Sequence, residues 1–237
     1  MMQNKVIVVI PTYNNPHTIK DVVNDVLAHG YEVIVVDDGS EHEVQNLFNA
    51  KEQESIHFVR HQINQGKGKA IISGTRKAKE LGYRYLLSMD GDGQHLASQA
   101  HLLIDVCHED EIIIGARNFQ LANVPLGSKF GRWFSNIWAQ LNTGKKITDS
   151  LSGYRIYPVS ILELPIETKK FDWEMEVLIR HAQAGKNIKE VPIECYYPLA
   201  EERVSHFRNF EDTMSIVWVH LQILYDRLIQ KIRQIFA

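Results

Sequence analysis

Short runs of β-branched residues alternate with helical stretches along the first half of the chain. Val6–Ile10 and Val33–Val36 are continuous apolar runs, which are typical of strands covered on both faces. The same pattern predicts further strands at residues 57–60, 83–89 and 112–114, and helices at residues 18–28, after residues 66–69 as far as Lys79, and at 171–184. Strands that alternate with helices at this spacing indicate an α/β fold with a mainly parallel central sheet flanked by helices.

The second half of the chain is less regular. Apolar residues at helical spacing between Phe130 and Leu141 predict a helix with one broad apolar face. Residues 149–155 form a polar loop that enters a strand, and residues 191–193 begin another extended segment. We therefore expect one domain at residues 1–210, followed by a C-terminal amphipathic helix at 211–237. That helix would pack on the domain, on a partner or on a membrane surface.

Composition narrows the functional classes. The 237 residues carry a formal net charge of -3, so no global basic field favours nucleic acid as a partner. The two cysteines are far apart and form no CxxC pair, which argues against a zinc site or a disulfide framework. No secretion signal precedes the first strand, and no apolar run reaches the roughly 18–20 residues that span a bilayer. We expect a cytoplasmic protein, with peripheral attachment to the inner face of the cell membrane as an alternative.

Polar clusters follow three of the predicted strands. They lie at residues 12–14, 37–40 and 90–93. In open parallel sheets the ligand binds beyond the carboxyl ends of the strands. Each cluster alone is compatible with an ordinary turn, because Asp and Gly are common turn formers. Three clusters at one edge of the sheet indicate a binding site.

Asp90 and Asp92 are two carboxylates separated by one glycine. Hard divalent cations such as Mg²⁺ or Mn²⁺ prefer oxygen ligands and bridge carboxylates to phosphates. Gln94 follows closely and would complete or orient the metal shell. The alternative is a solvated acidic turn, which the buried strand ahead of the pair disfavours.

Other polar residues are candidates for contacts with a nucleotide. Asp37 and Asp38 would accept hydrogen bonds from a base or a ribose, or would form a helix cap or Asx turn. Lys67 lies in a glycine-rich turn before a helix, which is a weak signal for an anion site. Arginines suit phosphates because their planar fork donates two parallel bonds; the candidates are Arg117, Arg132, Arg155 and Arg203.

Taken together, these motifs resemble family 2 glycosyltransferases with the GT-A fold, and in particular the dolichol-phosphate mannose synthase-like branch. The matching segments occur in the family's order and extend over roughly residues 5–210. They are residues 10–14, 36–40, 64–68, 90–95, 115–117, 149–155 and 190–193.

The resemblance implies roles for individual residues. Pro11, Tyr13 and Asp37 would hold the nucleoside, with Asp38 close by. Asp90, Asp92 and Gln94 would surround a divalent metal, Mg²⁺ or Mn²⁺. The arginines Arg117, Arg132 and Arg203 would face phosphates of donor or acceptor. The family often has Glu two residues after the tyrosine of the first motif, whereas this chain has Asn15.

The resemblance also implies an inverting transfer of a sugar from a UDP- or GDP-sugar. Family members that glycosylate a hydroxyl use a carboxylate base, often in a Glu-Asp pair, and no such pair follows the acidic cluster. Asp149 is the nearest candidate, with Glu174 and Glu176 as rivals. An anionic phosphate acceptor needs no strong base, so the sequence favours a polyprenyl phosphate or other lipid-linked acceptor. A hydroxyl acceptor, a nucleotidyltransferase and a non-catalytic nucleotide-sugar-binding module are the alternatives.

Overall fold

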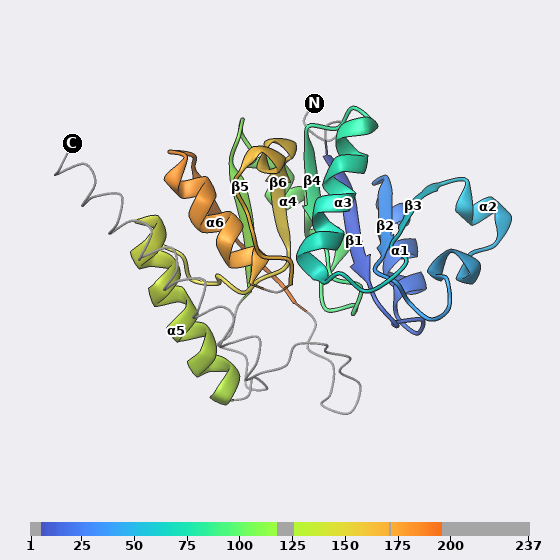
Figure 1. Cartoon of the computed structure of the whole chain (residues 1–237), viewed down its shortest axis with the longest axis horizontal. Coiled ribbons are helices and arrows are strands. Elements are labelled where there is room, and N and C mark those ends of the chain that lie inside the picture. The colour runs from blue at the N-terminus through green and yellow to red at the C-terminus, as the bar shows by residue number, and fades with distance from the viewer. Residues whose placement is uncertain (1–5, 118–125, 171, 196–237) are drawn as a thin grey trace.

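The computed structural model describes residues 6–117, 126–170 and 172–195, which form a layered α/β structure around one sheet (Figure 1). The sheet has seven strands in the order β3-β2-β1-β4-β6-β5-β7. Their bounds are β1 Val6–Thr12, β2 Val33–Asp37, β3 Ile56–Arg60, β4 Tyr85–Ser88, β5 Ile112–Arg117, β6 Arg155–Pro158 and β7 Ile188–Ile193.

The direction of the strands confirms the expected mainly parallel sheet. Strand β1 is parallel to β2 and β4, β2 is parallel to β3, and β5 is parallel to β7. Strand β6 is antiparallel to both of its neighbours, β4 and β5. It therefore begins at the edge where β4 and β5 end, and this places the loop before Arg155 beside the acidic cluster.

Helices cover both faces of the sheet. Alternate residues of β1 point to opposite faces: Val8 lies in the same buried cluster as residues of α1 and α4, whereas Val9 lies in the cluster that contains residues of α3 and α6. The bounds are α1 Ile19–Ala28, α2 Ala50–Gln53, α3 Lys67–Glu80, α4 Ala100–Asp105, α5 Leu126–Thr143 and α6 Trp173–Gln183. Short 3₁₀ segments are η2 Val44–Leu47, η3 Ala97–Gln99 and η4 Val159–Glu163.

Helix α5 confirms the helix predicted between Phe130 and Leu141. It forms where the apolar spacing predicts it and contacts α6, below the sheet in Figure 1. Only part of its apolar face is covered, because Trp133 is 57% exposed and Leu141 is 65% exposed. Among the described residues, no helix is long and apolar enough to cross a membrane. The proposed division at residue 210 and the C-terminal helix lie outside the described residues and stay predictions.

Candidate active site

The ends of β1, β2 and β4 meet at one edge of the sheet. The backbone N–H of Asp38 donates to the carbonyl of Thr12 at 2.9 Å, which joins the loops after β2 and β1. Asn15 Nδ2 and Thr18 Oγ1 donate to the carbonyl of Gly91 at 2.8 and 2.6 Å, which joins β1 to the acidic loop. The three polar clusters therefore converge as the sequence predicts.

The acidic loop extends directly from β4. Met89, directly after β4, is buried, and its N–H donates to the carbonyl of Val9 in β1 at 3.0 Å. Asp90 is partly exposed, and Asp92 accepts a hydrogen bond from the backbone N–H of Gln94 at 3.0 Å. The backbone of Gln94, rather than its side chain, therefore shapes this loop. His95 lies beneath it, stacked on Tyr154 with ring centroids 5.0 Å apart.

Lys67, the first residue of α3, is the cation beside this loop. Its Nζ lies 2.6 Å from Asp90 Oδ1 and 3.1 Å from Glu174 Oε1. Gly153 makes this approach possible: a Cβ there would lie 2.6 Å from Asp90 Oδ2 and 2.7 Å from Lys67 Nζ. The turn before α3, a weak signal in the sequence, thus brings a lysine to the acidic pair.

The charges in this cluster shift one another's proton affinities. Burial would lower the pKa of Lys67, but Asp90 and Glu174 hold it above its usual value. Burial would raise the pKa of Asp90, but Lys67 holds it below its usual value. Burial and the charge of Asp90 raise the pKa of Asp92 to about 6, and burial lowers the pKa of His95 to about 4. At neutral pH Asp90 and Asp92 are therefore carboxylates, Lys67 is an ammonium group and His95 is a neutral imidazole.

Arg117 and Asp149 form a second ion pair at the end of β5. Arg117 Nε and Nη2 donate to the two oxygens of Asp149 at 2.7 and 2.9 Å, and its backbone N–H donates at 3.1 Å. Asp149 is only 1% exposed. Glu190 fixes the loop from below by accepting from the N–H groups of Thr148 and Asp149. The structure therefore gives Asp149 the role of orienting Arg117, and its carboxylate is already engaged.

Asp37 and Asp38 are both buried by their own loops. Asp37 accepts from the N–H groups of Ser40 and Val44 and forms an ion pair with Arg60. A nucleoside contact by the Asp37 carboxylate would have to share these partners.

Asp38 has a different set of partners, all from the connection between β3 and α3. It accepts from the N–H groups of Gln65 and Gly66 at 2.9 and 2.8 Å and lies 2.6 Å from His61 Nδ1. Gly66 has a φ of 96°, which favours glycine there. Asp38 thus fixes the turn that precedes Lys67.

Arg155 occupies a different place from the one expected of a phosphate ligand. It is fully buried, and its guanidinium donates to the carbonyls of Ser150, Ser152 and Glu174. A buried guanidinium needs its donors satisfied, and here main-chain carbonyls satisfy them. The contact expected between Arg155 and a nucleotide is therefore corrected: Arg155 shapes the loop that brings Gly153 against Asp90.

For the remaining expected site residues, the structure gives the position in the fold and the degree of burial. Pro11 and Tyr13 are half-buried at the end of β1, and Arg132 is half-buried on α5. Their roles toward a nucleoside or a phosphate stay predictions. Arg203 lies outside the described residues.

Asn15 and Thr18 belong to the site, although the sequence indicates no contact between either residue and the acidic loop. Asn15 is buried, and both side chains hold the carbonyl of Gly91 between the two acidic residues. The signal in the sequence was an amide where the resembling family often has a carboxylate. An amide donates a hydrogen bond to a carbonyl, whereas an ionised carboxylate cannot.

The acidic pair fits a hard divalent cation that is shared with a ligand. The charge of Asp90 raises the pKa of Asp92, and a cation between the two carboxylates would remove that repulsion. In the described part of the chain, no group of three or more His, Cys, Asp or Glu side chains could hold a metal ion. Oxygen atoms of a substrate and of water suit the remaining coordination positions of such a cation.

Comparison with known proteins gives a consistent family. Residues 7–163 match the model described as glycosyl transferase family 2. An undecaprenyl-phosphate mannosyltransferase from Micrococcus luteus is 31% identical over 205 residues, which cover 80% of this chain and 82% of the relative. A UDP-N-acetylglucosamine–dolichyl-phosphate N-acetylglucosaminyltransferase from Methanococcus voltae is also 31% identical, with 83% and 88% covered.

Solved structures share the fold. Glucosyl-3-phosphoglycerate synthase from Mycobacterium tuberculosis, crystallised with Mn²⁺, uridine diphosphate and phosphoglyceric acid, superposes with a TM-score of 0.68 at 16% identity. The match covers 92% of this chain and 78% of that one. Mannosyl-3-phosphoglycerate synthase from Rubrobacter xylanophilus gives a TM-score of 0.65 at 13% identity, with 96% and 75% covered.

Proposed function

Because the chain belongs to glycosyl transferase family 2, we propose that it transfers a sugar from a nucleoside diphosphate sugar to a polyprenyl phosphate, with inversion. The choice of a phosphate acceptor rests on the ion pair between Asp149 and Arg117, because that pair leaves Asp149 unavailable as a base. The choice of a nucleoside diphosphate sugar as donor rests on the acidic pair, Asp90 and Asp92, beside Lys67.

The donor half rests on charge. A departing nucleoside diphosphate carries concentrated negative charge, and preorganised cations stabilise it. Asp90 and Asp92 would hold Mg²⁺ or Mn²⁺, which supplies Lewis-acid stabilisation to such a leaving group. Lys67 adds an ammonium group at the same place. The solved structure with Mn²⁺ and uridine diphosphate supports this half, because its fold is the same.

The acceptor half rests on the three candidate bases. Asp149 is paired with Arg117, Glu174 with Lys67, and Glu176 with Arg180 and the N–H groups of residues 167 and 168. A hydroxyl acceptor would need one of these carboxylates to leave its partners and take a proton. A phosphate acceptor is already ionised at neutral pH and needs none. The names of the two relatives above, which act on undecaprenyl phosphate and dolichyl phosphate, support this choice.

The proposed step is a single displacement. An oxygen of the acceptor phosphate forms a bond to the anomeric carbon as the bond from that carbon to the diphosphate breaks. The electron pair leaves on the diphosphate, and no proton has to be removed. The chain's part is to position both substrates and to stabilise charge: Lys67 at the leaving group, and Arg117, oriented by Asp149, at a phosphate.

A lipid acceptor also implies a membrane, and we place the reaction at the inner face of the cell membrane. The exposed Trp133 and Leu141 on α5 are the described residues that suit such a contact.

The test is transfer by the purified full chain with Mg²⁺ or Mn²⁺. UDP- and GDP-sugars would be supplied with a detergent-solubilised polyprenyl phosphate, and the product followed by mass spectrometry. We expect a glycosyl phosphate lipid from one nucleotide series, with an inverted anomeric configuration by NMR.

Matched acceptors decide between the alternatives. The corresponding polyprenol has the same chain without the phosphate, and phosphoglyceric acid is a soluble phosphate with a free hydroxyl. Transfer to either of these in preference to the polyprenyl phosphate would contradict the proposal. Nucleotide binding without transfer to any acceptor would indicate a binding module.

A further inference from the structure

Lys67 lies between two carboxylates that differ in their exposure. Its Nζ is 2.6 Å from Asp90 Oδ1, in the acidic loop, and 3.1 Å from Glu174 Oε1, on α6. The side chain of Asp90 is 27% exposed, so it can meet a ligand, whereas the side chain of Glu174 is only 9% exposed. The reaction proposed above uses Asp90 and Lys67 and gives Glu174 no task of its own.

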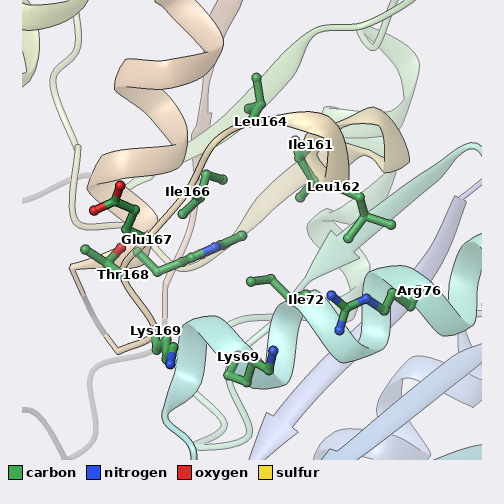
Figure 2. A pocket seen from close by; sticks show the side chains of 11 residues that line it. Lys69, Ile72, Arg76, Ile161, Leu162, Leu164, Ile166, Glu167, Thr168 and Lys169 are labelled. Carbon is green, nitrogen blue, oxygen red and sulfur yellow. The ribbon is translucent and has the colours of Figure 1, made fainter.

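The starts of α3 and α6 pack closely against each other. A Cβ on Gly68 would lie 2.3 Å from Trp173 Cβ, so a side chain there would force the two helices apart. The N–H of Lys69 donates to the carbonyl of Lys169 at 3.0 Å, and both residues line the hollow beside α3 (Figure 2). The contact between Lys67 and α6 therefore does not depend on the acidic loop.

Glu174 Oε1 has unused capacity to accept from Lys67. This oxygen is buried and accepts no hydrogen bond from the described residues. Its distance of 3.1 Å from Lys67 Nζ exceeds the roughly 2.7–2.9 Å of a directed, charge-assisted hydrogen bond, whereas the distance of 2.6 Å to Asp90 does not. The ammonium group is therefore turned toward Asp90, and Glu174 offers a second acceptor to which it can turn.

Lys67 and a divalent cation would compete for Asp90. Both are positively charged, and two such charges close together in a buried site repel each other strongly. An ammonium group that lost Asp90 as its partner would be a buried, uncompensated charge, which is costly. A second carboxylate removes that cost, and Glu174 is in place to supply it.

We propose that Glu174 is a positioning residue that keeps Lys67 in the site when Asp90 becomes a metal ligand. Without the cation, Lys67 neutralises Asp90. With Asp90 engaged, the ammonium group pairs with Glu174 and stays available to the diphosphate of the donor. The inference rests on the donor site proposed above, and it adds that Glu174 acts through Lys67.

The test is a double-mutant cycle on Mn²⁺ binding, measured by electron paramagnetic resonance on the purified full chain without nucleotide or acceptor. Lys67→Met removes the competing charge and should tighten Mn²⁺ binding roughly tenfold. Glu174→Gln leaves Lys67 with Asp90 alone and should weaken binding roughly tenfold, as loss of an outer-shell partner does. In the Lys67→Met chain, the same Glu174→Gln change should alter the Kd by less than about twofold, because its effect passes through Lys67.

Glu176→Gln is the matched control, because Glu176 is a buried carboxylate on the same helix that pairs with Arg180. It should leave the Mn²⁺ affinity unchanged. Thermal unfolding shows whether each variant is folded. If Lys67→Met is not folded, Lys67→Gln takes its place in the cycle, since its amide still donates hydrogen bonds to carboxylates.

Three outcomes would overturn the inference. The first is equal weakening by Glu174→Gln with and without Lys67, because Glu174 would then act on the cation by its charge alone. The second is unchanged Mn²⁺ binding by Glu174→Gln, and the third is weaker binding by Lys67→Met. A parent chain that binds no Mn²⁺ would instead contradict the proposed donor site, and the inference with it.

Discussion

At the scale of single residues, Asn15 positions the acidic pair by binding the backbone of the loop between its two members. Its amide and Thr18 hold the carbonyl between Asp90 and Asp92, so they set where the two carboxylates point. We expect Asn15→Ala to raise the metal concentration for half-maximal activity roughly tenfold, as loss of outer-shell partners commonly does. Asn15→Asp keeps the shape but replaces the donor with an oxygen that faces another oxygen, so it should be at least as damaging.

His17→Ala provides the control for this loop, because His17 is exposed and neighbours the same turn. It should leave the metal dependence unchanged. A metal titration of activity, with kcat and donor KM measured separately, checks the outcome. An Asn15→Asp variant with the parent's metal dependence would show that the hydrogen bond from Asn15 to the carbonyl of Gly91 does not position the acidic pair.

Asp92 makes a prediction about stability and pH. Its folded pKa of about 6 is raised above the roughly 3.9 of an unfolded chain, so the folded state binds the proton more tightly. Stability therefore falls as pH rises from about 4 to about 6 and stays lower above that range. In metal-free buffer, Asp92→Asn should raise the free energy of unfolding at pH 7.5 by about 1–2 kcal/mol, and this gain should vanish near pH 4.

Thermal unfolding at the two pH values checks this prediction. The same variant should lose almost all transfer activity, because an amide is a poorer ligand for a hard cation. A gain in stability together with a loss of activity is expected of a carboxylate that function requires, although the neighbouring carboxylate of Asp90 repels it. An Asp92→Asn chain that is less stable at pH 7.5 would contradict the assignment.

At the scale of elements, the start of α3 depends on Asp38. Its carboxylate accepts hydrogen bonds from two backbone N–H groups and lies against His61. Because Asp38→Asn weakens these hydrogen bonds, it should lower the free energy of unfolding by about 2 kcal/mol. Because the same turn carries Lys67, kcat should fall as well. The affinity for UDP or GDP, measured by calorimetry, separates two roles. We expect it to stay near the parent value; a large loss of affinity without loss of stability would make Asp38 a nucleoside ligand.

The elements themselves were largely predictable, because local patterns specify them. The β-branched runs of β1 and β2 and the polar residues at their ends indicate both the strands and the edge at which a ligand binds. The partners of Arg155 and Asp149 were not predictable, since they depend on which loops the antiparallel strand β6 brings together. The sequence does not distinguish an arginine that donates to buried carbonyls from an arginine that binds a phosphate.

At the scale of the whole molecule, the motifs of the sequence indicate the family and the fold, whereas the structure gives the partners of Arg155 and Asp149. The resemblance to the family rests on the order of the motifs along the chain, and that order can be recognised even where individual side chains make different contacts. The pairing of Lys67 with Asp90 and of Arg117 with Asp149 needed three-dimensional proximity across the sheet edge. In the proposed function, the pair of Lys67 and Asp90 serves the donor and the pair of Arg117 and Asp149 serves the acceptor.

Contact with a membrane is the remaining question at this scale, and α5 makes it testable. Trp133 and Leu141 are exposed on this helix, and the exposed Lys145 and Lys146 follow it. An apolar surface with nearby basic residues binds anionic interfaces. We expect the full chain to float with anionic liposomes, and a Trp133→Ser, Leu141→Ser double variant to bind them roughly tenfold more weakly. Ile63→Ser is the control, because Ile63 is 72% exposed in a loop far along the chain from α5. If the parent chain stays at the bottom of the gradient, or if Ile63→Ser weakens binding as much, α5 is not the contact.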